Sequence, residues 1–244
     1  MHLIVTGATG LVGTAVLQHM LATKSITKVS ILSRREVPLA QGQEKAEVII
    51  HKDFDKYPSD VLDKLKGADG CVWALGISQS QVTKEQYERI TFDYAMAAAK
   101  AFAGLKDPFK FVYVSGEGAT ETPGRFTPLF GGVKGRAERA LREFAKTTPS
   151  FKPYSARPGG VDPSQQPEIL PFIPRRQDLK SRAFGYLEHA VKAVIPKSML
   201  SPTADLGRAL VELAMSDGQP LEGEGVSGEG RTISNVGLRR LAGI

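Results

Sequence analysis

The chain has 244 residues, of which 41% are hydrophobic and 24% are charged, and its formal net charge is +6. This length suffices for one α/β domain with a full apolar core. No run of about 18 apolar residues occurs, and Gly7 and Gly10 interrupt the apolar N-terminus, so we expect neither a membrane span nor a signal peptide. Cys71 is the only cysteine, which rules out an internal disulfide and favours a cytoplasmic, reducing location.

The positive charge is dispersed along the chain. No aromatic-rich basic cluster stands out, so nucleic acid is not an expected partner. The excess of cations fits either an ordinary solvated surface or attraction of a small polyanionic molecule. The four histidines are scattered without the spacing of metal ligands, and no metal site is expected.

Strand-like and helix-like segments alternate along the first 160 residues. In chain order they are a strand at His2–Thr6, a helix at Leu11–Ala22, strands at Lys28–Ser33, Glu47–His51 and Gly70–Leu75, a helix at Thr83–Ala103, a strand at Phe109–Ser115, a helix at Val133–Lys146 with a Glu138–Arg142 pair on its exposed face, and a strand at Pro153–Arg157. This alternation predicts the α/β class, with a doubly wound parallel sheet (Rossmann fold) and helices on both faces.

The chain becomes less regular after Gly160. A proline-rich stretch predicts a long loop, and two further helices are expected at residues 181–195 and 201–218, the second capped by Ser201 or Thr203. We therefore expect a dinucleotide-binding core over residues 1–160. Residues 161–244 would form a small substrate-side lobe within the same domain.

Three glycines, Gly7, Gly10 and Gly13, separate the first strand from the first helix. In such a turn the first glycine allows positive φ, the second lets backbone approach a pyrophosphate, and the third lets the helix pack close to the sheet. The free amides at the helix N-terminus then bind the phosphates. The predicted phosphate-binding segment also includes Thr9, Leu11 and Val12.

The end of the second strand discriminates between dinucleotides. NAD-binding chains usually place a carboxylate there, but this chain has Ser33, Arg34 and Arg35. Guanidinium groups suit a 2′-phosphate, so NADP(H) is the predicted cofactor. After the third strand, Asp53 and Phe54 are candidates to flank the adenine, although an ordinary turn explains them equally well.

Several short motifs occur together in a recognisable order: VTGATGLVG, LSRR, ALG, YVSGEGA, VKGRAE and SARPGGV. In this combination the chain resembles the atypical short-chain dehydrogenases/reductases, and most of all the Tat-interacting-protein-like oxidoreductases and their fungal relatives. The resemblance implies that the backbone of Ala74, Leu75 and Gly76 lies beside the bound cofactor. It also implies that Arg157, Pro158 and Gly159 lie near the nicotinamide.

The resemblance also implies a catalytic trio of serine, tyrosine and lysine. Ser115 and Lys134 match the serine and the lysine, whereas Phe130 stands at the tyrosine position. The resemblance implies that Lys134 also binds the nicotinamide ribose of the cofactor. Relatives often carry a second serine where this chain has Gly116. A phenyl ring cannot exchange a proton, and the loss of general acid–base catalysis typically slows a reaction 10²–10⁴-fold.

Four explanations for Phe130 remain open at this point. The chain could have lost redox chemistry, or it could use another donor, such as Tyr113, Tyr154 or a water held by Lys134. It could perform a non-redox step, or it could be a Tyr-to-Phe variant made to trap a complex.

The leading hypothesis is an NADP(H)-dependent oxidoreductase acting on a small carbonyl or alcohol. The alternatives are a redox-inactive NADP(H)-binding regulator and an isomerase or cyclase. The apolar and aromatic side chains of the region after Gly160 suggest an apolar or aromatic substrate: Phe172, Ile173, Phe184 and Tyr186. A homodimer is a possible assembly.

Overall fold

A mostly parallel, eight-stranded sheet organises the computed structural model, which describes residues 1–173 and 196–244. The strand order is β3-β2-β1-β4-β5-β6-β10-β9, and β9 alone runs antiparallel to its neighbour among the described strands. The order reverses between β1 and β4, where open α/β sheets place their ligands. The strands are β1 His2–Thr6, β2 Lys28–Ser33, β3 Ala46–Ile50, β4 Gly70–Trp73, β5 Phe109–Val114, β6 Phe151–Ala156, β9 Val226–Ser227 and β10 Thr232–Ile233.

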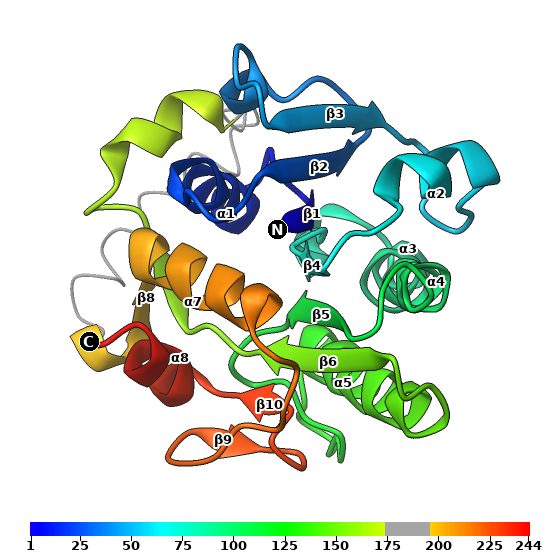
Figure 1. The fold of residues 1–244 in the computed structure, drawn as a ribbon. Helices are drawn as coiled ribbons and strands as arrows, with labels where there is room; N and C mark the ends of the chain where they lie inside the picture. The colour runs from blue at the N-terminus through cyan, green and yellow to red at the C-terminus, as the bar shows by residue number, and fades with distance from the viewer. Residues whose placement is uncertain (174–195) are drawn as a thin grey trace.

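Helices cover both faces of this sheet (Figure 1). One face carries α1 Leu11–Ala22, α7 Thr203–Met215 and α8 Asn235–Leu241. The other carries α2 Ser59–Leu65, α3 Lys84–Glu88, α4 Tyr94–Phe102 and α5 Leu129–Thr147. Leu3 and Val5 of β1 belong to the core on the α1 side, and Ile4 belongs to the core on the opposite side. Burial of both faces explains why the central strands are continuous apolar runs.

The expected α/β class and the doubly wound sheet are confirmed, with small shifts at the ends of elements. The helix predicted from Val133 begins earlier, at Leu129, so Phe130 and Lys134 lie one turn apart on α5. The helix predicted over Thr83–Ala103 forms as α3 and α4 joined by a π-helical segment, Arg89–Asp93. Its start is fixed by a capping box between Thr83 and Gln86.

Several elements were not predicted from the sequence: α2, α8, β9, β10, and a second, two-stranded sheet of β7 Gly160–Asp162 and β8 Leu200–Pro202. Short 3₁₀ turns occur at Pro38–Ala40, Gln79–Gln81, Pro167–Phe172 and Lys197–Met199. The predicted cap of α7 was wrong, because the helix follows Pro202 without a side-chain cap and Ser201 Oγ donates to Asn235 Oδ1 at 2.6 Å instead. The helix expected over residues 181–195 lies outside the described residues, as do Phe184 and Tyr186.

The expected surface pair between Glu138 and Arg142 was also wrong. Glu138 has 0% of its surface exposed. Gly131 and Gly135 share its face of α5, and a Cβ built on either would clash with backbone, 2.5 Å from the Gly118 carbonyl oxygen and 1.9 Å from that of Thr120. This face of α5 therefore packs closely against the loop after β5, and the Glu138 carboxylate is buried with it. Arg142 pairs instead with Glu121, at 2.6 and 2.9 Å.

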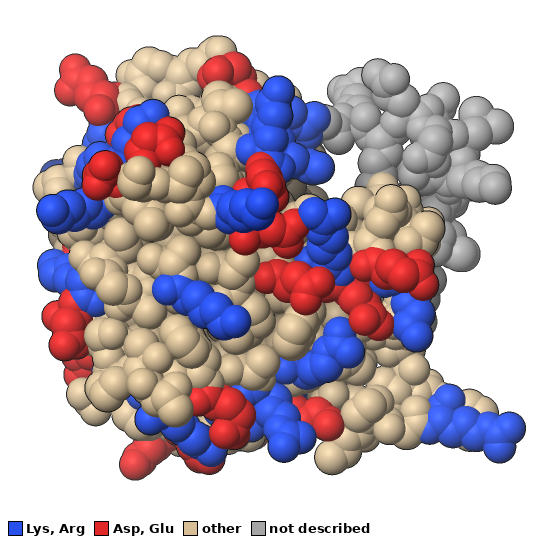
Figure 2. Space-filling view, turned by 90° about the vertical axis from the view of Figure 1, so that its right-hand side faces the viewer, with Lys and Arg blue, Asp and Glu red and all other residues tan. Residues whose placement is uncertain are grey.

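Charges of both signs intermingle on the face that Figure 2 presents. Two ion pairs link neighbouring segments of the chain: Arg89 pairs with Asp55 in the turn after β3, and Arg136 of α5 pairs with Glu88 of α3 at 3.2 Å. Over the ranges 1–173 and 196–244, we find no helix with the length and apolarity that crossing a bilayer requires.

Candidate functional site

The turn between β1 and α1 is tightly constrained by its glycines. Gly7 has a φ of +68°, and a Cβ on it would lie 2.3 Å from the carbonyl oxygen of Ala74. A Cβ on Gly13 would lie 2.1 Å from the Gly7 carbonyl oxygen. Gly10 precedes the first turn of α1 and provides no side-chain cap. The amides of that turn therefore remain available to a ligand oxygen, as a phosphate cradle requires.

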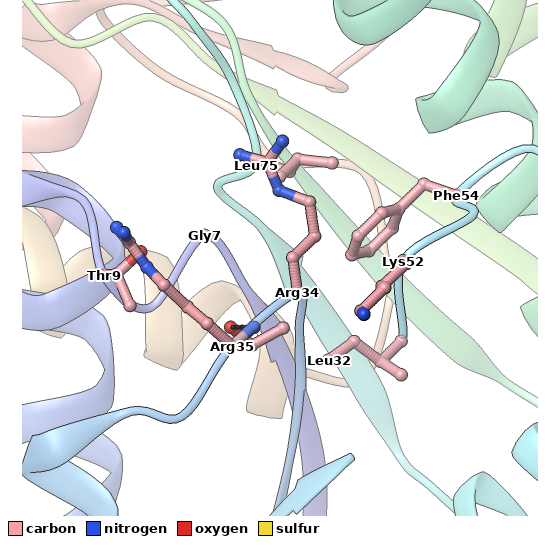
Figure 3. Close-up of a pocket in the computed structure, with 9 residues that line it drawn as sticks. Gly7, Thr9, Leu32, Arg34, Arg35, Lys52, Phe54 and Leu75 are labelled. Carbon is pink, nitrogen blue, oxygen red and sulfur yellow. Dashed lines mark hydrogen bonds between the residues drawn. The ribbon is translucent and has the colours of Figure 1, made fainter. Parts of the chain in front are cut away.

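A pocket of about 400 Å³ opens on one side of this turn (Figure 3). The loops after β1, β2, β3 and β4 all contribute to it, because the carboxyl ends of parallel strands meet at one edge of the sheet. Its lining consists of Gly7, Thr9, Leu32, Ser33, Arg34, Arg35, Lys52, Phe54 and Leu75.

Three cations surround this first pocket: Arg34, Arg35 and Lys52. None of them forms an ion pair with a carboxylate in the described parts of the chain. One guanidinium nitrogen of Arg35 donates to Thr9 Oγ1 at 3.3 Å, and Arg34 extends over the pocket toward Leu75 (Figure 3). The pocket thus presents unpaired positive charge to its ligand.

Of the two residues suggested for the adenine, only Phe54 lines the pocket. Asp53 instead accepts the amide of Asp55 at 3.2 Å in a local turn, and its role in binding stays a prediction. Lys52 was missed by the sequence reasoning. Its position two residues after β3 was the available signal, because β3 ends beside β2 and the two arginines follow β2.

A larger pocket of about 910 Å³ lies on the other side of the glycine turn. Leu75 lines both pockets, so they form one crevice along the strand ends. Predicted residues that line the second pocket are Gly10, Leu11, Val12, Gly13, Ala74, Leu75, Gly76, Ser115, Phe130, Lys134, Pro158 and Gly159. Lining residues that were not predicted as site residues include Thr91, Glu117, Ser198, Met199, Asn235 and Val236.

Lys134 reaches into this pocket from the second turn of α5. Its Nζ donates to the carbonyl oxygen of Ser115 at 2.5 Å and to that of Val114 at 3.3 Å. Desolvation lowers the pKa of Lys134 to about 8, and the negative charge of Glu138 only partly opposes this shift. The amine can therefore exchange a proton far nearer neutral pH than an ordinary lysine can.

Ser115 lines the pocket, but its hydroxyl is turned toward Glu138 and donates to Oε1 of that carboxylate. Arg157 completes the arrangement, with Nε 2.9 and 3.2 Å from the two carboxylate oxygens. The Ser115 hydroxyl hydrogen is thus held by a buried ion pair rather than offered to the pocket. Arg157, predicted to touch the cofactor, belongs to this pair and does not line either of the two pockets.

Phe130 and Gly116 leave the pocket without two hydroxyl groups. The Phe130 ring lies near Gly118, and its backbone amide donates to Gln79 Oε1 at 2.9 Å. A Cβ on Gly116 would lie 3.8 Å from Lys134 Nζ, which is ordinary van der Waals contact. A serine at position 116 would therefore place its hydroxyl beside the lysine, and this chain leaves that space open.

The two tyrosines considered as replacement donors are both engaged elsewhere. Tyr113 lines the pocket, but its hydroxyl donates to the Thr91 carbonyl oxygen at 3.1 Å and burial raises its pKa well above the ordinary value. Tyr154 lies in the core on the α7 side, where its hydroxyl donates to the Gln219 carbonyl oxygen at 2.5 Å.

Thr91 belongs to the π-helical segment between α3 and α4. Such segments often occur at functional sites. This one places Thr91 in the lining of the pocket, and the Thr91 carbonyl oxygen accepts the hydroxyl group of Tyr113.

Comparisons with known proteins agree with this geometry. A family model described as NAD(P)H-binding matches residues 7–148. The chain is 38% identical to leucinostatins biosynthesis cluster protein T of Purpureocillium lilacinum, over 98% of this chain and 94% of that protein.

Solved structures share the fold at low identity. One is a short-chain dehydrogenase/reductase of Saccharomyces cerevisiae (TM-score 0.66, 17% identity, 96% of this chain and 95% of the other). Another is Bordetella bronchiseptica WbmF in complex with NAD⁺ (TM-score 0.68, 15% identity, 99% and 76%). The expected nicotinamide dinucleotide thus has a cradle whose glycines, free amides and crevice fit it. The chain belongs to the NAD(P)H-binding family and has the Rossmann fold of the atypical short-chain dehydrogenases/reductases.

Proposed function

We propose that this protein is an NADP(H)-dependent reductase that transfers hydride to, or from, a small apolar carbonyl or alcohol compound. One observation supports the proposal above all: a single crevice joins a cation-ringed pocket to a larger pocket containing Lys134. The bound dihydronicotinamide would supply the hydride. The residues of the second pocket would orient the substrate and provide the proton.

The preference for NADP(H) is argued from charge. Arg34, Arg35 and Lys52 surround the first pocket without a carboxylate partner among the described residues. A phosphate ester on the adenosine ribose would neutralise this charge through charge-assisted hydrogen bonds. A bare 2′-hydroxyl, as in NAD(H), would leave it uncompensated.

The apolar character of the substrate is argued from the rim of the second pocket. Met199 and Val236 line it with 58% and 48% of their surface exposed. Large apolar side chains exposed at a pocket favour an apolar ligand. The name of the Purpureocillium relative places that protein in a biosynthesis cluster, and we propose a biosynthetic intermediate as the substrate here.

The cofactor preference is tested by titrating NADPH and NADH separately and following nicotinamide fluorescence. Arg34→Ala should weaken NADPH binding by about 10–100-fold, the magnitude of a hydrogen bond to a charged group, and leave NADH binding unchanged. Arg139→Ala, an exposed arginine of α5 outside both pockets, is the matched control. Equal losses for both cofactors, or no loss, would contradict the proposal.

A redox-inactive NADP(H)-binding protein is the second candidate. The absence of hydroxyl groups at Phe130 and Gly116 favours it, because these two positions face the reacting end of the pocket. It predicts tight NADPH binding with no carbonyl-dependent loss of absorbance at 340 nm.

A further inference from the structure

We propose that Lys134 is the proton donor of this chain, and that its ammonium group protonates the substrate oxygen directly, through the space left open beside Gly116. The inference rests on the proposed reductase function and deepens it. It assigns to the lysine the step that a phenol would otherwise perform.

The contacts of Nζ leave one position free for a substrate. An ammonium group has three N–H donors, and two of those of Lys134 are directed to the carbonyl oxygens of Ser115 and Val114. Close to the same nitrogen, a Cβ built on Gly116 would stand 3.8 Å away, and no side chain occupies that space. A substrate oxygen can therefore approach the third N–H without displacing a protein atom.

The hydroxyl groups of Ser115 and Tyr113 and the carboxyl group of Glu117, which also line the second pocket, are engaged in other hydrogen bonds. The hydroxyl hydrogen of Ser115 is held by Glu138, and that of Tyr113 by the Thr91 carbonyl. Glu117 Oε1 accepts the backbone amide of Asn235 at 2.6 Å, an arrangement that suits a carboxylate acceptor. Phe130 offers no polar atom.

The titratable and charged groups near Lys134 come from three segments of the chain. Glu138 lies one turn further along α5 and pairs with Arg157, the residue that follows β6, which leaves it little net attraction for the ammonium. Tyr113 lies on β5, and Glu117 lies in the loop that follows it. Desolvation dominates this balance and lowers the pKa of Lys134 to about 8. A catalytic acid works best when its pKa is close to the working pH.

In the proposed step, the bound dihydronicotinamide would supply hydride to the carbonyl carbon, and the carbonyl π electrons would move to oxygen. That oxygen takes a proton from Lys134 Nζ, giving an alcohol, the oxidised cofactor and a neutral amine. Solvent then returns a proton to the amine, which completes the cycle.

The kinetic test uses NADPH with two apolar carbonyl probes, 9,10-phenanthrenequinone and 4-nitrobenzaldehyde, over pH 6–10. The wild-type rate should be flat at low pH and fall as pH rises through about 8, where the ammonium form is lost. Lys134→Arg keeps the charge but cannot release a proton, so kcat should fall at least 100-fold while NADPH affinity changes less than fivefold. Lys146→Arg, an exposed lysine of the same helix, should leave kcat unchanged.

Phe130→Tyr tests whether the wild-type chain lacks a proton donor or already has one. Because Lys134 already donates the proton, this change alone should raise kcat less than tenfold at pH 7. In the Lys134→Arg background it should restore kcat at least tenfold, since the phenol then supplies the proton. A gain of 100-fold or more from Phe130→Tyr alone would show that the natural chain lacks a donor, and would overturn the assignment of Lys134.

A measurement without substrate provides an independent readout. Competitive acetylation at increasing pH, followed by peptide mass spectrometry, gives the titration of each lysine. Lys134 should be half reactive near pH 8, with Lys146 well above it. A Lys134 that titrates above pH 10 would contradict the proposal.

The outcomes also separate this inference from the reductase proposal. If NADPH binds and both probes are reduced with the same pH profile in the wild type and Lys134→Arg, only the donor assignment fails. If NADPH binds but neither the wild type nor Phe130→Tyr reduces either probe, hydride transfer itself is contradicted.

Discussion

The two ends of the crevice are built by different means. The dinucleotide cradle depends on backbone, because the φ of Gly7 and the contact distances at Gly7 and Gly13 exclude any side chain there. The second pocket differs in single side-chain groups: it contains the amine of Lys134 and has no hydroxyl group at Phe130 or Gly116. A fold can therefore keep its affinity for a cofactor when the loss of one or two side-chain hydroxyl groups changes the reaction that it can catalyse.

This difference has a physical basis. Losing the cradle requires a change that the surrounding backbone cannot accommodate. Replacing a phenol by a phenyl ring preserves the shape of the pocket and alters only proton transfer.

The first prediction concerns the cradle. Gly13→Ala places a Cβ 2.1 Å from the Gly7 carbonyl oxygen, so backbone must move and the phosphate-binding turn opens. We expect NADPH affinity to fall by roughly 100-fold, in line with the few kcal/mol that overpacking costs. Gly104→Ala is the control, because its Cβ would meet nothing within 4 Å. Unchanged affinity in Gly13→Ala would mean that the cradle does not hold the dinucleotide.

The second prediction concerns the support of the reacting end. Glu138→Ala leaves Arg157 without its carboxylate and frees the hydroxyl of Ser115. Breaking a buried pair in this way should lower the free energy of unfolding by about 3 kcal/mol and the melting temperature by about 6–12 °C. Glu143→Ala removes a half-exposed partner of Lys146 on the same helix and should cost less than about 0.5 kcal/mol. Equal losses in urea titrations of the two variants would contradict the buried-pair account.

The smallest effect lies outside the crevice, at the start of β1. Burial lowers the pKa of His2 to about 4, and its Nε2 lies 2.8 Å from Ser30 Oγ. In the unfolded chain the His2 imidazole binds a proton near pH 6.5, whereas in the folded protein it stays neutral down to about pH 4. The neutral imidazole therefore contributes its full stabilisation of the fold above pH 6.5, and this contribution is lost as pH falls toward 4.

Between pH 6.5 and pH 4 the free energy of unfolding should fall by about 1 kcal/mol less in His2→Gln than in the wild type. This figure is reduced because the ring is partly exposed. NADPH affinity should stay unchanged. A steeper pH dependence in the variant would show that the sign is wrong.

The cradle and the parallel sheet could be predicted because their signals are local. Glycines at fixed spacing follow an apolar strand, and arginines follow the next one. The buried position of Glu138 could not be read in this way, because it depends on how closely Gly131 and Gly135 bring α5 to the loop after β5. Helical spacing alone favoured an exposed pair with Arg142.

The C-terminal contribution to the sheet escaped prediction for a related reason. Thr232–Ile233 is a two-residue strand that is defined by its pairing with β6 on one side and β9 on the other. Asn235, which follows it at the pocket wall, carries no motif of its own. The sequence resemblance predicts that Phe130 stands where the family has a tyrosine, and this stays a prediction. The structure adds that Gly116 leaves open the space beside Lys134.

The account is tested most directly by a crystal structure of the protein grown with excess NADP⁺. We predict the pyrophosphate on the amides that follow Gly10, the 2′-phosphate within hydrogen-bond distance of Arg34, and the nicotinamide in the pocket of Lys134. A cofactor whose 2′-phosphate points to solvent, or a glycine turn that holds no dinucleotide at millimolar NADP⁺, would contradict it.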